Sequence, residues 1–255
     1  MALKPSISFT KHAVPKKGSV VVFSVEQGEL SDVARSADPA GALGRAFPIA
    51  DFSGKFASSV ELIAPDGGLD RLTAIGAGKA SSLKEHDWVK LGGAVAAQFR
   101  KAADVSVVVD LPGVAAGGPE AAAVAAGILL RAYSFEKYKT RKDDGDGKPA
   151  DRKPFRFTIH SSDPAAAKKA FTAADAVSDG VWLARDLVNE PANMLGPVEF
   201  ADRMRELTAA GLEVEVLDEE QLAELKMGAL LAVGQGSERP SRVVVLQWNG
   251  AKSKR

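Results

Sequence analysis

The 255-residue chain has no cysteine, which removes several kinds of chemistry at once. Disulfides, thiolate nucleophiles, cysteine zinc sites and iron–sulfur clusters are excluded, and the absence fits a reducing compartment. Histidine is nearly as scarce, because only His12, His86 and His160 occur, at positions too scattered for ligand spacing. We therefore expect these three histidines to have structural or surface roles.

Net charge and long apolar stretches are also missing. The 33 basic residues balance 33 acidic ones, so the overall charge favours neither nucleic acid nor an anionic membrane as a partner. No window approaches the roughly 18 uninterrupted apolar residues of a membrane span. The amino-terminal apolar run begins too late and is too short for a signal peptide. We expect a cytoplasmic protein with neither a membrane nor a nucleic-acid partner.

The composition that remains is that of a folded protein, with 45% apolar and 26% charged residues. Short β-branched runs alternate with alanine-rich helical stretches, which is typical of α/β folds whose sheets are covered by helices. The expected strands are 19–25, 59–63, 71–76, 105–110 and 155–160. The expected helices are 83–102, 119–138 and 164–188, the last with Asp163 as its N-cap.

Two domains are expected, 1–160 and 161–255, with the boundary near Ser161. The polar, glycine-bearing segment 138–154 predicts an exposed loop, and the helix from Pro164 is long enough to connect two domains. After it we expect helix 197–210, strand 213–217, helix 219–226 and strand 242–248. Two strands are too few for a self-sufficient sheet, so the second domain is expected to be incomplete.

A glycine-rich turn at 76–79 follows a strand and precedes a helix, the context in which such turns bind phosphate. The match is poor. A P-loop needs glycine where Thr73 stands and serine or threonine where Ala80 stands, and a dinucleotide fingerprint needs glycine at Ser81. The pattern favours a tight strand-to-helix turn.

Acidic residues at Asp143, Asp144 and Asp146 raise the possibility of a calcium loop. An EF-hand register places Lys142 and Lys153 at positions that must be acidic, so the interpretation as a solvated loop is preferred.

The acidic pair Glu219–Glu220 suits the first turn of a helix, because adjacent helical side chains do not face each other. Gly-x-Ser-x-Gly, the mark of a serine nucleophile, is absent from the sequence. We assign no catalytic, cofactor-binding or metal residue.

Two separated strings carry a resemblance to a known family. They are ARDLVNEPANMLGPVEFADRM, at 184–204, and the segment 211–250 that ends in VVVLQWNG. Both are similar to the opening of the catalytic domain of the cytosolic leucyl aminopeptidase family, hexameric peptidases with two divalent metal ions. The matching residues are Arg185, Leu187, Val188, Asn189, Pro191, Asn193, Pro197, Met227, Gly228, Gly236 and Ser237, followed by the strand that ends at Gly250.

The resemblance implies a macro-like amino-terminal three-layer α/β domain, a long linker helix and an incomplete α/β peptidase domain. More loosely, 76–79 resembles the family's Gly-x-Gly-Lys turn, and 129–140 resembles the helix end before its variable loop. For Asn189, Asn193 and Pro197 we prefer a scaffold role, and we expect Met227 in the core.

The family's metal ligands, a lysine, several aspartates and a glutamate, follow the strand that here ends at Gly250. The resemblance thus implies the amino-terminal portion of a manganese- or zinc-dependent aminopeptidase that acts on peptides in intracellular protein turnover. We expect this chain to be truncated, inactive alone and without bound metal, and the complete protein to be a homo-hexamer.

Two other readings stay open. The chain could be a non-enzymatic ligand-binding or interaction module of macro-like fold, or it could contact DNA, although it lacks a basic stripe. The apolar strand 242–248 also predicts a tendency to aggregate.

Overall fold

The computed structural model describes residues 4–65, 67–99, 104–138 and 155–250. Contacts divide the chain into two compact units, Met1–Trp182 and Leu183–Arg255, each of which is described by itself. The segment 139–154, with Asp143, Asp144 and Asp146, lies outside the described residues, so neither the loop nor the calcium interpretation is tested.

A six-stranded sheet forms the centre of the first unit, in the order β1-β6-β5-β2-β4-β3. All neighbouring strands are parallel except β3, which runs antiparallel to β4 at one edge. The strands are β1 Ser6–Lys11, β2 Ser19–Ser24, β3 Ser59–Ile63, β4 Arg71–Gly76, β5 Asp104–Val108 and β6 Arg156–Ser161. The five strands expected from the sequence are confirmed, and β1 is an additional edge strand.

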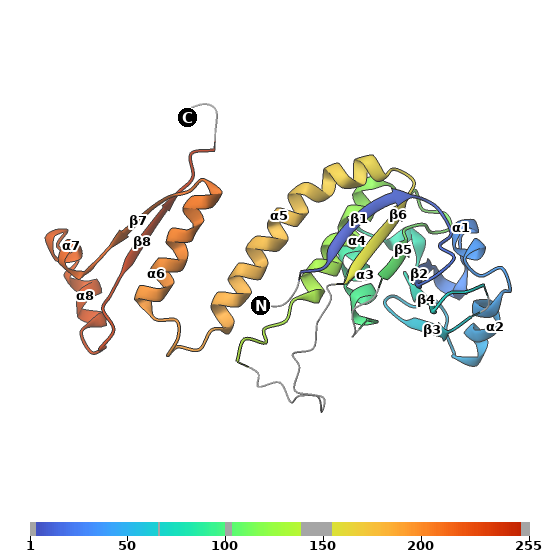
Figure 1. Ribbon diagram of the computed structural model, residues 1–255, viewed down its shortest axis with the longest axis horizontal. Coiled ribbons are helices and arrows are strands. Elements are labelled where there is room, and N and C mark those ends of the chain that lie inside the picture. Colours follow the sequence, from blue (N-terminus) through green and yellow to red (C-terminus); the bar gives the residue numbers. More distant parts are fainter. Residues whose placement is uncertain (1–3, 66, 100–103, 139–154, 251–255) are drawn as a thin grey trace. The chain divides into compact units, whose positions relative to one another are not determined.

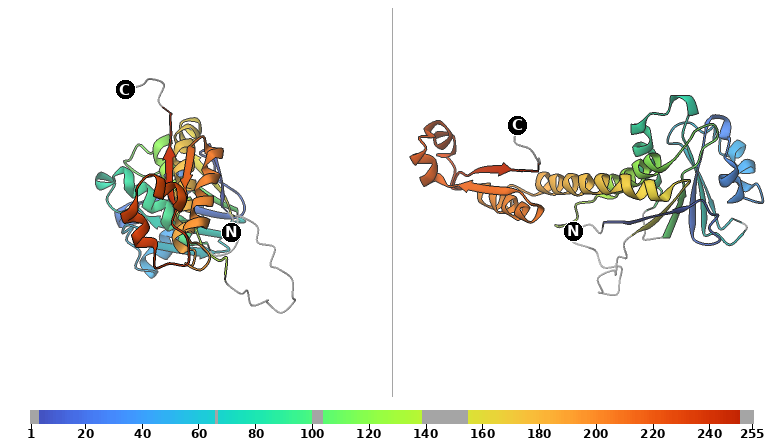
Figure 2. Two further views of the ribbon diagram at one scale, coloured as in Figure 1. Left: turned by 90° about the vertical axis from the view of Figure 1, so that its left-hand side faces the viewer. Right: turned by 90° about the horizontal axis from the view of Figure 1, so that it is seen from above.

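Helices cover both faces of this sheet, as Figures 1 and 2 show. The helices of this unit are α1 Asp32–Ser36, α2 Ala42–Ile49, α3 Glu85–Ala97, α4 Gly118–Ala132 and α5 Pro164–Asn189, the last of which continues into the second unit. On β2, Val21 and Phe23 enter the hydrophobic cluster under α3 and α4, while Val20 and Val22 enter the cluster under α1 and α2. A central parallel strand buried on both faces is continuously apolar for this reason. The predicted three-layer α/β class is confirmed.

α3 and α4 pack with their backbones unusually close. A Cβ built on Gly92 would lie 2.0 Å from the carbonyl oxygen of Val124, and one on Gly127 would lie 1.9 Å from that of Val89. Real atoms do not approach so closely, so glycine at these two positions permits the spacing between the helices.

The helix α5 begins as the sequence predicts. Asp163 caps it, because its Oδ1 accepts a hydrogen bond of 2.9 Å from the backbone amide of Ala166. The predicted helix 164–188 is confirmed over Pro164–Asn189.

The first part of α5 packs onto the first unit. The rings of Phe171 and Phe9 are 5.3 Å apart at their centroids, and the indole Nε1 of Trp182 donates to the carbonyl oxygen of Leu129 at 3.1 Å. The compact units divide between Trp182 and Leu183, inside the helix.

The second unit contains α6 Pro197–Arg205, β7 Glu213–Leu217, α7 Glu219–Glu224, α8 Gly228–Gly234 and β8 Val243–Gln247. β7 and β8 form an antiparallel two-stranded sheet, so the strands expected here are confirmed. The predicted helix 197–210 ends as an α-helix at Arg205 and continues as a 3₁₀ turn through Ala210. Within the described part of the chain, every helix is too short or too polar to cross a membrane.

Candidate functional site

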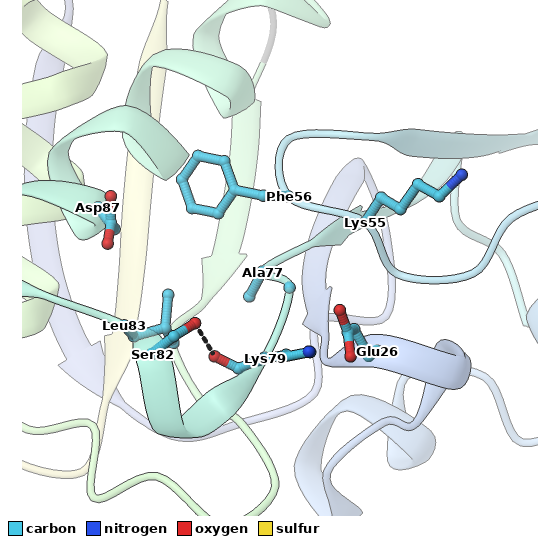
Figure 3. A pocket seen from close by; sticks show the side chains of 9 residues that line it. Glu26, Lys55, Phe56, Ala77, Lys79, Ser82, Leu83 and Asp87 are labelled. Carbon is cyan, nitrogen blue, oxygen red and sulfur yellow. Dashed lines mark hydrogen bonds between the residues drawn. The ribbon is translucent and has the colours of Figure 1, made fainter.

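The first unit has a pocket at the carboxyl ends of β2 and β4, which are adjacent and parallel (Figure 3). After β2 the chain leads to α1 and α2 on one face of the sheet, and after β4 it leads to α3 on the other. Such divergence of two neighbouring connections is where open α/β sheets bind their ligands. The pocket has a volume of about 360 Å³ and is lined beside the 77–78 turn by Glu26, Lys55, Phe56, Lys79, Leu83 and Asp87.

Three of the backbone amides of the 76–79 turn are already occupied. Those of Gly76, Ala77 and Gly78 donate to protein carbonyl oxygens at 2.8, 2.7 and 2.9 Å. The acceptors lie in three neighbouring segments and are Ser58, Ser24 and Gly54, respectively. A phosphate-binding turn instead presents free amides to its ligand. These hydrogen bonds support the interpretation of 76–79 as a tight turn.

Asp87 is held in place by its neighbours and is not a free acid or base. Its carboxylate accepts from the backbone amide of Lys84 at 3.0 Å and from Lys90 Nζ at 3.1 Å. The hydrogen bond from Lys84 and then that from Lys90 hold the pKa of Asp87 below its usual value. Ser82 likewise is not poised as a nucleophile, because its hydroxyl donates to the Lys79 carbonyl oxygen at 2.9 Å.

Three charged residues that line this pocket, Glu26, Lys55 and Lys79, have no ion-pair partner in the described ranges. Figure 3 shows the side chains of Glu26 and Lys79 at the same end of the pocket, with the Phe56 ring, Leu83 and Asp87 toward the other end. The ammonium group of Lys55 points away from these side chains. The arrangement can bind a small polar molecule, and it contains no nucleophile and base pair for catalysis.

Glu26, Lys55 and Phe56 were not singled out by the sequence. Glu26 follows the strand that was predicted over 19–25, so the rule that ligands bind at the carboxyl ends of parallel strands could have pointed to it. Phe56 and Lys55 come from the loop before β3, and only the fold brings that loop beside the 76–79 turn.

The three histidines stay apart from this pocket. His160 is buried at the end of β6, where burial, in the first place, and the nearby His12 hold its pKa below the ordinary value, against an opposing contribution from the Lys11 backbone. His12 Nε2 lies 3.3 Å from the carbonyl oxygen of Val109, and His86 is exposed in the first turn of α3. These positions support the structural and surface roles expected of them.

No metal centre is formed by the described residues. Nowhere within 4–65, 67–99, 104–138 and 155–250 do three histidine, aspartate or glutamate side chains gather so that they could hold an ion. The acidic pair Glu219–Glu220 lies in the first turn of α7, as predicted, and Glu219 Oε1 accepts from the Ser241 amide at 2.8 Å.

Several residues that this chain shares with the family stabilise the backbone of the second unit. Asn189 Nδ2 donates to the Arg185 carbonyl oxygen at 2.8 Å, at the end of α5. Arg239 Nη2 donates to the carbonyl oxygen of Asn193 at 2.8 Å. Pro197 begins α6, as expected.

The expectation that Met227 belongs to the core is wrong. Its side chain is 36% exposed, because it stands at the turn between α7 and α8 and not within a helix face that packs on the sheet. A further pocket in this unit has a volume of about 530 Å³ and lies between α6 and β8, where it is lined by Leu195, Gly196, Pro197, Phe200, Arg242 and Val244.

Two family models match the chain. The model of the cytosol aminopeptidase family N-terminal domain matches residues 20–142, and the model of the catalytic domain of the same family matches residues 182–255. A probable cytosol aminopeptidase of Chelativorans sp. (strain BNC1) is 52% identical over the whole chain, and one of Rhizobium rhizogenes is 49% identical. The chain spans about half of these relatives, 51% of each.

Solved structures give the same picture. A mutant of tomato leucine aminopeptidase superposes with a TM-score of 0.82 at 26% identity, over 100% of this chain and 52% of its own. The bottromycin maturation enzyme BotP in complex with Mn gives a TM-score of 0.69 at 26% identity, over 91% of this chain and 45% of its own.

Proposed function

Because the chain belongs to the cytosol aminopeptidase family, we propose that it is the amino-terminal portion of a leucyl aminopeptidase that removes amino-terminal residues from peptides in intracellular protein turnover. The main support is that the N-terminal and catalytic family models match in order along one chain. The proposed domains are 1–160 and 161–255, with the linker helix in the second.

The complete protein is proposed to use two divalent ions, manganese or zinc. The manganese-bound structural relative supports metal dependence. Such ions polarise a peptide carbonyl and activate water when bound. The described residues do not fit a centre of this kind, since no three suitable side chains gather there. We therefore derive no catalytic step from them, and the 255 residues by themselves are proposed to lack peptidase activity.

The complete protein is further proposed to act in the cytoplasm as a homo-hexamer on peptide substrates. Support for the location comes from relatives that are named cytosol aminopeptidases. Size-exclusion chromatography with light scattering of the full-length form tests the assembly, because a monomer or dimer would contradict it.

A hydrolysis assay tests the peptidase proposal. The 255-residue protein and the full-length Chelativorans relative are each incubated with leucyl-p-nitroanilide and manganese, with and without a chelator. We expect chelator-sensitive release of nitroaniline by the relative and none above background by the 255-residue protein. Chelator-sensitive activity of the short protein would overturn its proposed inactivity, and no activity of the relative would remove the basis for the whole assignment.

The second candidate is a non-enzymatic ligand-binding module. The pocket at the divergence of β2 and β4 favours it, because this is where α/β sheets bind small molecules. The occupied amides of Gly76, Ala77 and Gly78 speak against a phosphate ligand. Calorimetric titration with adenine nucleotides discriminates, since saturable binding near one per chain would favour a nucleotide-binding module.

A further inference from the structure

The pocket between Glu26 and Lys79 has a charge balance that selects its ligand. Four charged residues line it, Glu26, Lys55, Lys79 and Asp87. Asp87 is paired with Lys90, and the ammonium group of Lys55 points away from the other side chains, so one carboxylate, of Glu26, and one ammonium group, of Lys79, are left for a ligand. A site for a multiply charged phosphate carries an excess of cations, which this one lacks, and the amides of Gly76, Ala77 and Gly78 are already bound to protein carbonyl oxygens. Equal numbers of the two charges instead suit a ligand with no net charge that carries one group of each sign.

The positions of the charges restrict the chemical class of the ligand further. Lys79 and Glu26 lie at one end of the pocket in Figure 3, and neither has an ion-pair partner in the described ranges. Asp87 is neutralised by Lys90 and by the Lys84 amide. One ammonium and one carboxylate side by side match the two charged groups on the α-carbon of a free amino acid.

The rest of the pocket is suited to an apolar side chain. Phe56 is 39% exposed and lies with Leu83 at the end that faces away from Glu26 and Lys79. Asp87 lies at this end too, but its carboxylate is already bound by Lys90 and by the Lys84 amide. The volume of about 360 Å³ is at the low end of the range for small-molecule sites, which favours a ligand of amino-acid size.

We propose that this pocket binds a free α-amino acid with an apolar side chain, with the ligand carboxylate on Lys79, the ligand ammonium on Glu26 and the side chain against Phe56 and Leu83. The site lies in the first unit and does not depend on peptidase activity. If the complete protein releases such amino acids from peptides, the same site would bind its product.

The test is calorimetric titration of the 255-residue protein with three probes of one shape. L-leucine carries both charges, leucinamide lacks the carboxylate, and 4-methylpentanoate lacks the ammonium. We expect saturable binding of leucine near one per chain, and binding at least about tenfold weaker for each analogue, because each loses one charge-assisted contact. No leucine binding, or equal binding of all three probes, would overturn the proposal.

Two variants test whether Lys79 binds the ligand carboxylate and Glu26 binds the ligand ammonium. Lys79→Met should weaken leucine binding at least about tenfold and remove the preference for leucine over leucinamide, while Glu26→Gln should remove the preference over 4-methylpentanoate. Both side chains are exposed, so the fold should tolerate the changes, and circular dichroism checks this. Lys16→Met and Glu220→Gln, at exposed positions outside the pocket, are matched controls that should bind leucine as the parent does.

Two further outcomes of these titrations would overturn the proposal. Saturable binding of AMP or inorganic phosphate that Lys79→Met abolishes, without leucine binding, would show a phosphate site and overturn the proposal. Leucine binding that survives both pocket variants would place the amino acid elsewhere on the chain and would also overturn it.

Discussion

Single glycines decide how closely α3 and α4 approach. At Gly92 and Gly127 an added Cβ would meet backbone carbonyl oxygens, which cannot move without shifting a helix. At Gly180 in α5, by contrast, nothing lies within 4 Å of the position that a Cβ would take. The same substitution should therefore have opposite effects at the two kinds of position.

We predict that Gly127→Ala lowers the free energy of unfolding by about 1–3 kcal/mol, because overpacking forces α3 and α4 apart. Gly180→Ala, the matched control, should raise the free energy of unfolding by about 0.5–1 kcal/mol, because alanine restricts the unfolded chain and favours the helix. Denaturant unfolding monitored by circular dichroism measures both. Equal effects of the two substitutions would show that the close helix contact does not matter.

His160 makes the stability of the first unit depend on pH. Its pKa is lowered in the folded state, chiefly by burial, so the unfolded chain binds its proton more readily. The folded state is favoured above the ordinary histidine value of about 6.5, and this contribution is lost as the pH falls below it.

Thermal unfolding between about pH 7.5 and 5 measures this effect, since that window brackets the ordinary histidine pKa. The midpoint should fall with pH less steeply for His160→Gln, which cannot titrate, than for the parent protein. The exposed control His86→Gln should keep the parent's slope. If the midpoints of His160→Gln and the parent protein change in parallel with pH, His160 does not contribute to the pH dependence of stability.

Among the secondary-structure elements, α5 shows how local chemistry sets a boundary. Asp163 satisfies the amide of Ala166, and Pro164 at the first helical position loses no hydrogen bond. Lys4 Nζ reaches the side of this helix, where Asp175 and Asp179 lie 2.7 and 2.5 Å away. These three side chains are partly solvated, so the ion pairs contribute little compared with the apolar contacts of the helix.

Removal of the helix cap should be measurable. We predict that Asp163→Ala lowers the free energy of unfolding by about 1 kcal/mol, since the first turn loses its side-chain acceptor. Asp163→Ser, which keeps an acceptor, should lower the free energy of unfolding by only a few tenths of that 1 kcal/mol. The midpoint of thermal unfolding compares the two variants, and an Asp163→Ala protein as stable as Asp163→Ser would exclude the capping role.

At the scale of the whole molecule, the second unit exposes much apolar surface. Val245 and Leu246 on β8 are each 44% exposed, and Trp248 is 76% exposed. Within the described residues β8 is paired only with β7, so its other edge is open. An open apolar edge strand is a template for pairing with another chain.

We predict that the 255-residue protein self-associates as its concentration rises and that Val245→Lys reduces this, because a charge on the edge strand opposes pairing. Val177→Lys adds the same charge at an exposed position of α5 and should leave the association unchanged. Sedimentation velocity over a range of concentrations measures both. A parent protein that stays monomeric would contradict the prediction.

The sequence alone was sufficient for features that depend on neighbouring residues. The apolar run at β2, the start of α5 at Asp163 and Pro164, and the 213–217 strand were all predicted, because periodicity and capping act over a few residues. The family resemblance was also readable from the string that begins at Ala184. The edge strand β1 was missed, although the alternation of polar residues with Ile7 and Phe9 could have indicated it.

Only the tertiary structure decided what lies beside what. Glu26, Phe56 and Lys79 come from three connections between strands. Glu26 and Lys79 meet because β2 and β4 pair in parallel, and Phe56 joins them because β3 runs antiparallel to β4, so that the segment before β3 lies at the carboxyl end of β4. The compact units divide inside α5 because Trp182 packs on α4. Strand order and packing depend on the burial of the whole core, so no local pattern in the sequence could specify the composition of this pocket.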